Sequence, residues 1–141
     1  MINDGLKLKG KLAISLNGKI IQEVDNLVVT AGKGYVASRM KDATATAMSH
    51  MAIGSGSTAA AASDTALGNQ LGRVALTSTT VSSAVVTYVA SFPAGTGTGA
   101  VTEAAILNAS SGGTMLCRTV FSVVNKGAQD SMTVTWTVTV S

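Results

Sequence analysis

The last stretch of the chain, Met132–Val140, alternates strictly between apolar and hydroxyl side chains. Met132, Val134, Trp136, Val138 and Val140 share one parity, and four threonines share the other. Successive side chains of a strand point to opposite faces, so this pattern predicts a strand with one apolar face and Trp136 at its centre. A helical period would scatter the threonines around the whole cylinder. We therefore expect the chain to end inside a sheet, with Trp136 buried.

The first part of the chain shows the same alternation and predicts a hairpin. Leucine and isoleucine follow one parity from Leu6 to Leu16, whereas Lys7, Lys9 and Lys11 follow the other. Asn17-Gly18 comes next, a pair typical of a two-residue hairpin turn, and Lys19–Val24 is the expected return strand. Lysines on an exposed strand commonly prevent edge-to-edge association. Alternatively, Lys7, Lys9 and Lys11 contact an acidic surface of a partner.

Between these strands the sequence predicts one short helix near residues 31–41. Thr30 is its expected N-cap, and Tyr35, Val36 and Met40 form its expected buried stripe. Residues 54–63 are rich in Gly, Ser, Thr and Ala, which predicts either a loop or an extended arm. Residues 64–67 are expected to form one helical turn.

Further short apolar runs predict strands over residues 73–79, 81–92, 101–108 and 114–123, the last two joined as a hairpin. The strand over 81–92 carries bulky side chains on both parities, which is typical of burial on two sides. A chain of 141 residues is normally one domain, so we expect a single domain over 1–141. The fold class that we expect is mainly β, an antiparallel β-sandwich, jelly-roll-like or Greek-key.

Composition narrows the function classes. Charged residues make up 12% of the chain and the formal net charge is +3, so no dense basic patch indicates nucleic-acid binding. A surface so sparsely charged is either a Ser/Thr-covered monomer or partly covered by a partner or by further copies of the chain. No apolar run reaches the roughly 20 residues of a membrane helix, so we expect no membrane partner. The first residues lack the apolar segment of a signal peptide, and we expect synthesis and assembly in a cytosol.

Residue types that act in catalysis in other proteins do not occur in this sequence in the groupings that an active site requires. His50 lies between methionines, and the single cysteine, Cys117, alternates with apolar residues on a predicted strand, so both are expected to be packing residues. Glycine runs at 54–56 and 95–99 do not match the spacing of phosphate-binding loops. Glu103 is expected to pair with Arg118 across a hairpin. We predict no enzyme activity, no cofactor and no metal site.

Several segments in a fixed order resemble a family of small virion structural proteins of tailed bacteriophages. They are Asn26–Lys33, Ala37–Met40, Met48–Gly56, Asp64–Leu67, Phe92–Glu103, Met115–Leu116, Arg118–Phe121, Asn125–Gly127 and the closing Thr/Val strand. The resemblance covers nearly the whole chain. Members are described as capsid cement or decoration proteins, or as tail-fibre or tail-associated proteins.

The resemblance implies a bacteriophage capsid cement protein that binds the assembled capsid and stabilises it. Such a protein is made in the host bacterial cytoplasm and is found on the virion capsid surface. Its partners would be the major capsid protein and further copies of itself, usually in a homotrimer. The possible capsid contact residues are Lys7, Lys9 and Lys11. The alternative is a tail, baseplate or tail-fibre component of the same kind of virion. A non-viral binding module, such as a carbohydrate-binding sandwich, is a further alternative.

Overall fold

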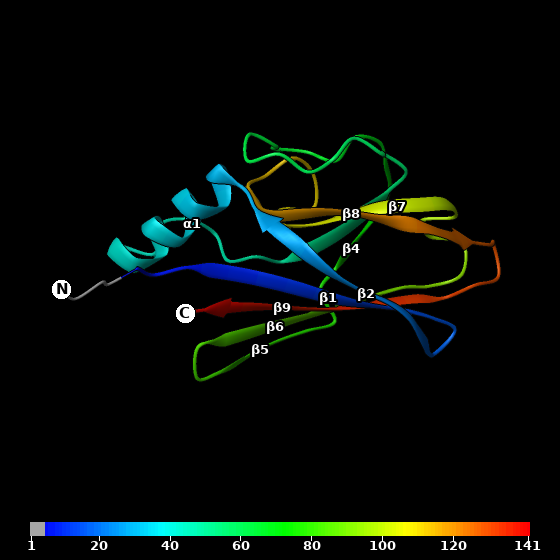
Figure 1. Ribbon diagram of the computed structural model, residues 1–141, viewed down its shortest axis with the longest axis horizontal. Helices are drawn as coiled ribbons and strands as arrows, with labels where there is room; N and C mark the ends of the chain where they lie inside the picture. The colour runs from blue at the N-terminus through cyan, green and yellow to red at the C-terminus, as the bar shows by residue number, and fades with distance from the viewer. Residues whose placement is uncertain (1–4) are drawn as a thin grey trace.

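The computed structural model describes residues 5–141 and consists of one antiparallel sheet and one helix (Figure 1). The nine strands are hydrogen-bonded in the order β4-β3-β7-β8-β2-β1-β9-β6-β5. Their bounds are β1 Leu8–Leu16, β2 Lys19–Val28, β3 His50–Gly54, β4 Gln70–Ala75, β5 Ser78–Ser82, β6 Val85–Phe92, β7 Gly99–Leu107, β8 Met115–Lys126 and β9 Met132–Val140; helix α1 is Thr30–Lys41. The mainly β, antiparallel class predicted from the sequence is confirmed.

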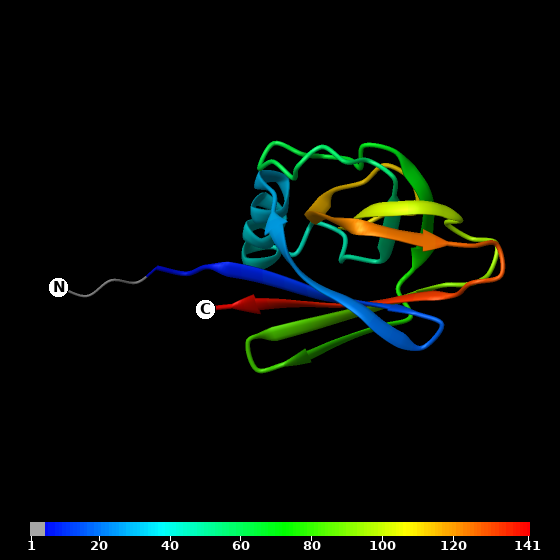
Figure 2. The same ribbon diagram turned by 45° about the vertical axis from the view of Figure 1, so that its right-hand side comes forward.

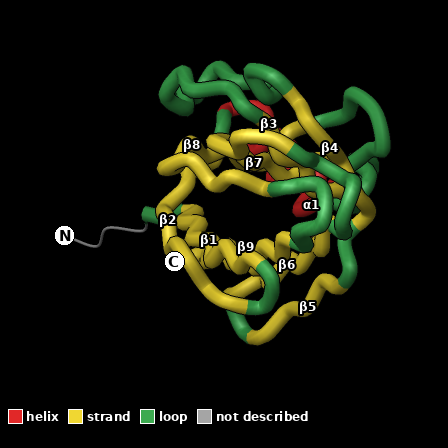
Figure 3. Tube along the Cα trace, turned by 90° about the vertical axis from the view of Figure 1, so that its right-hand side faces the viewer, coloured by secondary structure: helices red, strands yellow, loops and turns green. Residues whose placement is uncertain are grey.

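The sheet curls into a half-barrel because β2 passes from one part of it to the other. The first part of β2 pairs with β1, whereas its last two residues, Leu27 and Val28, pair with Arg118 and Cys117 of β8. In Figures 1 and 2 the part formed by β3, β4, β7 and β8 therefore lies over the part formed by β1, β9, β6 and β5. Figure 3 shows the curl end-on. A β-sandwich or jelly-roll topology is not confirmed, because the strands form one continuous sheet.

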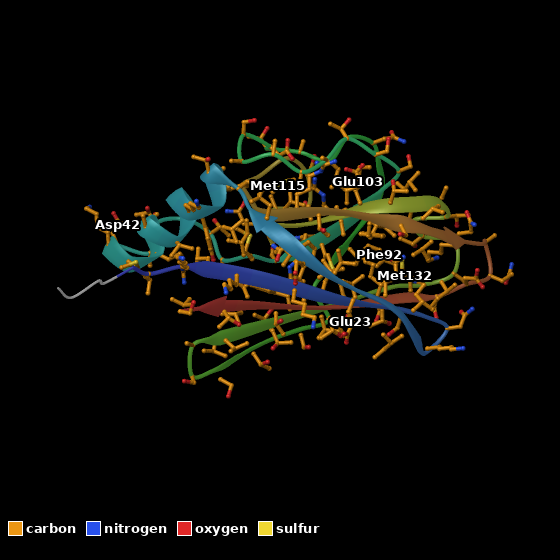
Figure 4. All side chains as sticks on the ribbon, viewed as in Figure 1. Glu23, Asp42, Phe92, Glu103, Met115 and Met132 are labelled. Carbon is orange, nitrogen blue, oxygen red and sulfur yellow. The ribbon has the colours of Figure 1, made fainter. Side chains whose placement is uncertain are left out.

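The core fills the space between the two facing parts of the sheet. Strand β9 pairs with β1 on one side and β6 on the other, and its apolar face points inward. Trp136 is fully buried, as predicted. Phe92 and Met132, labelled in Figure 4, lie in the same core with Leu12 and Ile106. The alternation read from the sequence thus matches the burial pattern of this strand.

Helix α1 differs in detail from its prediction. Val29 is the N-cap and no side chain caps the helix, so the expected N-cap role of Thr30 is wrong. Gly32 is the buried residue of the helix and packs so closely on β8 that a Cβ there would clash with the carbonyl oxygen of Leu116. Tyr35 and Val36 are half-buried, but Met40 is 75% exposed, so the expected buried stripe holds only in part.

Two turns show where local sequence signals succeed and fail. Asn17 and Gly18 adopt φ values of 51° and 83° and join β1 to β2 as predicted. Ser83, at φ 53°, turns the chain between β5 and β6, although no glycine marks this turn. The strands expected at 73–79 and 81–92 are therefore three shorter strands, β4, β5 and β6. Strand β6 is fully buried on one face only, at Tyr88, Ala90 and Phe92.

Candidate functional site

The start of β1 and the end of β9 lie beneath α1 at one end of the half-barrel (Figures 1 and 2). Side chains of these elements line an apolar groove there. We call it the end groove. It consists of two adjoining hollows, with volumes of about 700 Å³ and about 300 Å³. The larger is lined by Leu6, Lys7, Leu8, Lys9, Lys33, Val36, Met40 and Val140, and the smaller adds Tyr35, Arg39, Val86, Tyr88, Leu116 and Val138.

The end groove exists because β2 leaves β1 early. The β1–β2 ladder ends at the pair Gly10–Asn26, after which β2 turns to β8 and leads into α1. The start of β1 is thus flanked by a helix instead of a strand. Leu6 and Met40, on opposite sides of the groove, are 67% and 75% exposed. Large exposed apolar side chains around a hollow are typical of a binding surface.

The rim of the end groove is positively charged. Lys7, Lys9 and Lys33 are exposed, and none of them is within salt-bridge distance of a carboxylate in residues 5–141. Arg39 is already engaged, since its Nη1 donates to the carbonyl oxygens of Ala43 and Ala45 after the helix. The groove therefore combines an apolar lining with three lysines that are available to an anionic group.

The three lysines predicted as partner contacts lie in two different places in the structure. Lys7 and Lys9 line the end groove. Lys11 lies on the outer face of the sheet, where its Nζ is 3.6 Å from Glu23 Oε2, with both side chains more than half exposed. Because Lys11 already has an acidic neighbour, Lys7 and Lys9 are the better candidates for contacting a partner.

A buried carboxylate organises the opposite side of the molecule, labelled in Figure 4 as Glu103. Glu103 is 0% exposed and accepts backbone N–H bonds from Gly56, Gly68 and Asn69 at 2.7–2.8 Å. Arg118 donates to the same carboxylate from Nε at 3.1 Å and from Nη2 at 2.9 Å. The predicted Glu103–Arg118 pair is confirmed, although it is buried and not exposed.

This carboxylate holds the loop of residues 55–69 against the body. Arg118 also donates to the carbonyl oxygen of Thr58 and to the Asp64 carboxylate at 2.9 Å. Of the two alternatives for residues 54–63, the stretch is thus a bound loop and not an extended arm. Asp64–Leu67 does not form the expected helical turn, because Asp64 faces Arg118 and accepts a bond from the Ala61 N–H instead. We call Glu103, Arg118 and Asp64 the loop clamp.

The electrostatics of the loop clamp favour a charged Glu103. Burial alone would raise the pKa of Glu103, but the N–H donors of Asn69, Gly68 and Gly56 and the guanidinium of Arg118 outweigh it and hold the pKa below its usual value. The N–H of Gly56 is engaged by this carboxylate. The glycine run at 54–56 therefore binds a carboxylate of the protein itself, that of Glu103.

Of the remaining candidates for chemistry, Cys117 lies in the core and His50 is half-buried in β3. Cys117 is fully buried, and burial raises the pKa of its thiol, which makes a nucleophilic thiolate unfavourable. His50 Nδ1 lies 2.7 Å from Ser49 Oγ. No three His, Cys, Asp or Glu side chains within residues 5–141 are grouped as a metal site would require. The one helix in that range, α1, is too short and too polar to cross a bilayer.

Comparison with protein-family models, curated proteins and solved structures finds no match to this chain. Sequence reasoning missed the end groove, because the point at which β2 leaves β1 depends on its pairing with β8. The one available signal was the pair of lysines, Lys7 and Lys9, beside Leu6 and Leu8.

Proposed function

We propose that this chain is a virion structural protein of a tailed bacteriophage, a capsid cement protein without enzyme activity that docks through its end groove. The observation that carries the proposal is the end groove itself, an exposed apolar hollow rimmed by Lys7, Lys9 and Lys33 on an otherwise sparsely charged chain. Covering apolar surface contributes roughly 25 cal/mol per Å². The lysines add attraction to an acidic surface and orient the approach. The family resemblance of the sequence is a second support.

The proposed partners are the major capsid protein and further copies of this chain in a homotrimer. A trimer at a three-fold point of a capsid would engage three equivalent surfaces at once. Linked contacts increase the overall affinity by about 10²–10⁴ over one contact. Each end groove therefore needs only modest affinity to hold adjacent capsid subunits together, after assembly in the host bacterial cytoplasm.

The proposed docking requires a rigid protein, and two features of the structure are expected to keep this one rigid. The loop clamp ties residues 55–69 to the sheet through charge-assisted bonds. The two facing parts of the sheet share one core around Trp136 and Phe92. We further propose that these two facing parts of the sheet act as the two layers of a β-sandwich, jelly-roll-like or Greek-key. A rigid protein loses less conformational entropy on binding than a flexible arm.

The test is the position of the chain in purified virions. Virions are disrupted, DNA-filled heads are separated from tails by density, and an antibody against the chain is applied to both fractions. The proposal predicts the chain in the head fraction, at a copy number comparable with that of the capsid lattice points. Detection in tails alone would reject the cement function and support the tail, baseplate or fibre alternative.

A further inference from the structure

Strand β1 has a free edge at its start. Along its whole length β1 pairs with β9, from Leu8–Val140 to Leu16–Met132. On its other side the first paired residue is Gly10. Before Gly10 the backbone of β1 therefore faces the end groove and α1 instead of a neighbouring strand.

The hydrogen bonds between β1 and β9 determine which way the free backbone groups of β1 point. The Lys7 N–H donates to the Ser141 carbonyl at 2.6 Å, and the Ser141 N–H donates to the Lys7 carbonyl at 2.8 Å. In an antiparallel pair alternate residues bond to alternate sides, so the N–H and C=O groups of Leu6 and Leu8 point away from β9. Within residues 5–141 no backbone group of β2 is paired with them. These groups form a short open template for another strand.

The two sides of this edge differ in chemistry. Leu6 and Leu8 share the parity of the buried Leu12 and Ile14, and with Val36 and Met40 of α1 they line the end groove. Lys7 and Lys9 share the opposite parity. A strand laid along this edge would thus have apolar neighbours on one face and lysines on the other.

We propose that the end groove binds an extended segment of another protein, which adds to the free edge of β1 as an antiparallel or parallel strand. Alternate side chains of the segment are apolar and enter the groove between β1 and α1. The intervening side chains are acidic and lie beside Lys7 and Lys9. Main-chain bonds to Leu8 and Leu6 supply affinity, and the side-chain alternation supplies specificity.

A second copy of this chain fits the edge less well, because the rim is basic and the chain itself carries a net charge of +3. An acidic segment of a different protein is complementary to the rim. The inference rests on the proposed function in one respect: the proposed function places the acidic partner protein on the capsid surface.

The test uses a matched pair of variants, Leu8→Pro and Leu8→Ala, in the full chain. Both shorten the side chain, but only proline removes the N–H that points into the groove. An edge strand tolerates proline where its N–H faces solvent, so pairing with β9 is preserved. The probe is a peptide of about ten residues with alternating valine and glutamate, a length typical of a strand. Alternating valine and lysine is the control peptide.

Binding is measured by calorimetry, and amide hydrogen exchange locates it. The glutamate peptide should bind, slow exchange at the Leu8 amide and leave the Lys9 amide unchanged. Leu8→Pro should weaken binding at least about tenfold relative to Leu8→Ala. Lys7→Glu should also weaken it, whereas Lys19→Glu at the far end of the hairpin should not. Equal binding of the two peptides, or equal binding by the proline and alanine variants, would overturn the inference.

Two further outcomes separate this inference from the proposed function. If purified heads bind wild type and Leu8→Pro equally well, strand addition is wrong and the cement function stands. If the peptide adds to β1 but heads bind no protein, the cement function is wrong and strand addition stands. Self-association that Leu8→Pro dissolves and Leu8→Ala does not would identify a second copy as the occupant and reject an acidic partner.

Discussion

Replacing Glu103 with glutamine tests whether the loop clamp holds residues 55–69. The substitution keeps the shape of the side chain but removes its charge and one acceptor oxygen. In the native protein Oε2 accepts from Gly56 and Asn69, and Oε1 accepts from Gly68 and Arg118. A glutamine NH₂ group at either position would face N–H donors. At least two donors would lose their partner.

The structure sets the size of the effect. Arg118 is 2% exposed, and without Glu103 it would keep only Asp64 as an acidic partner. Removing one member of a buried ion pair costs about 3–5 kcal/mol, because the other charge stays buried. We therefore expect Glu103→Gln to lower the free energy of unfolding by about 3–5 kcal/mol.

The assay is urea unfolding, combined with amide hydrogen exchange at Gly56, Gly68 and Asn69, which should all lose protection. The matched control is Glu23→Gln, which removes an exposed carboxylate 3.6 Å from Lys11 and should cost at most about 1 kcal/mol. If Glu103→Gln costs no more than Glu23→Gln, or if the three amides keep their protection, the loop clamp does not hold the loop.

Four further predictions follow from packing and ionisation. Trp136→Ala should cost about 3–5 kcal/mol by leaving a cavity, measured by urea unfolding, and an indole emission typical of exposure to water in the wild type would contradict its burial. Gly32→Ala should destabilise the protein, because the added Cβ would meet the Leu116 carbonyl. Gly34 has open space around it, so Gly34→Ala should stabilise α1 by about 0.5–1 kcal/mol. Thermal melts in which both variants shift the melting temperature in the same direction would refute this packing. The Cys117 thiol should react with a disulfide reagent only at the rate of unfolding, and fast labelling of native protein would show that it is accessible. The depressed pKa of Glu103 gives stability above the ordinary glutamate pKa of about 4.3 that is lost as pH falls through its lower folded value, so the wild type should lose more stability on acidification than Glu103→Gln.

The sequence predicted those elements whose structure is decided by neighbouring residues. Strand β9 matches its predicted bounds because its alternation and its burial have the same period. The Asn17–Gly18 hairpin forms because both residues accept positive φ. Cys117 is buried as its strand parity indicated. In each case the information lies within about ten residues.

Features that depend on distant contacts were missed or left open. The composition of residues 54–63 left a loop and an extended arm as alternatives, because the carboxylate that binds the loop comes from Glu103, 47 positions after Gly56. Met40 was assigned to a buried stripe, yet its side chain is 75% exposed and lines the end groove. The end groove results from the departure of β2 from β1 after the pair Gly10–Asn26, which the local pattern does not encode.

The most direct test of docking through the end groove is the binding of purified protein to heads that lack it. Met40→Glu places a carboxylate at the groove, at a position already 75% exposed, so folding should be unaffected. Ile20→Glu, at a position 59% exposed at the other end of the β1–β2 hairpin, is the matched control. Copies bound per head are counted by co-sedimentation. We predict that wild type and Ile20→Glu saturate the heads and that Met40→Glu binds at least about tenfold more weakly. Equal binding by all three proteins, or binding of wild type to tails and not to heads, would contradict the account.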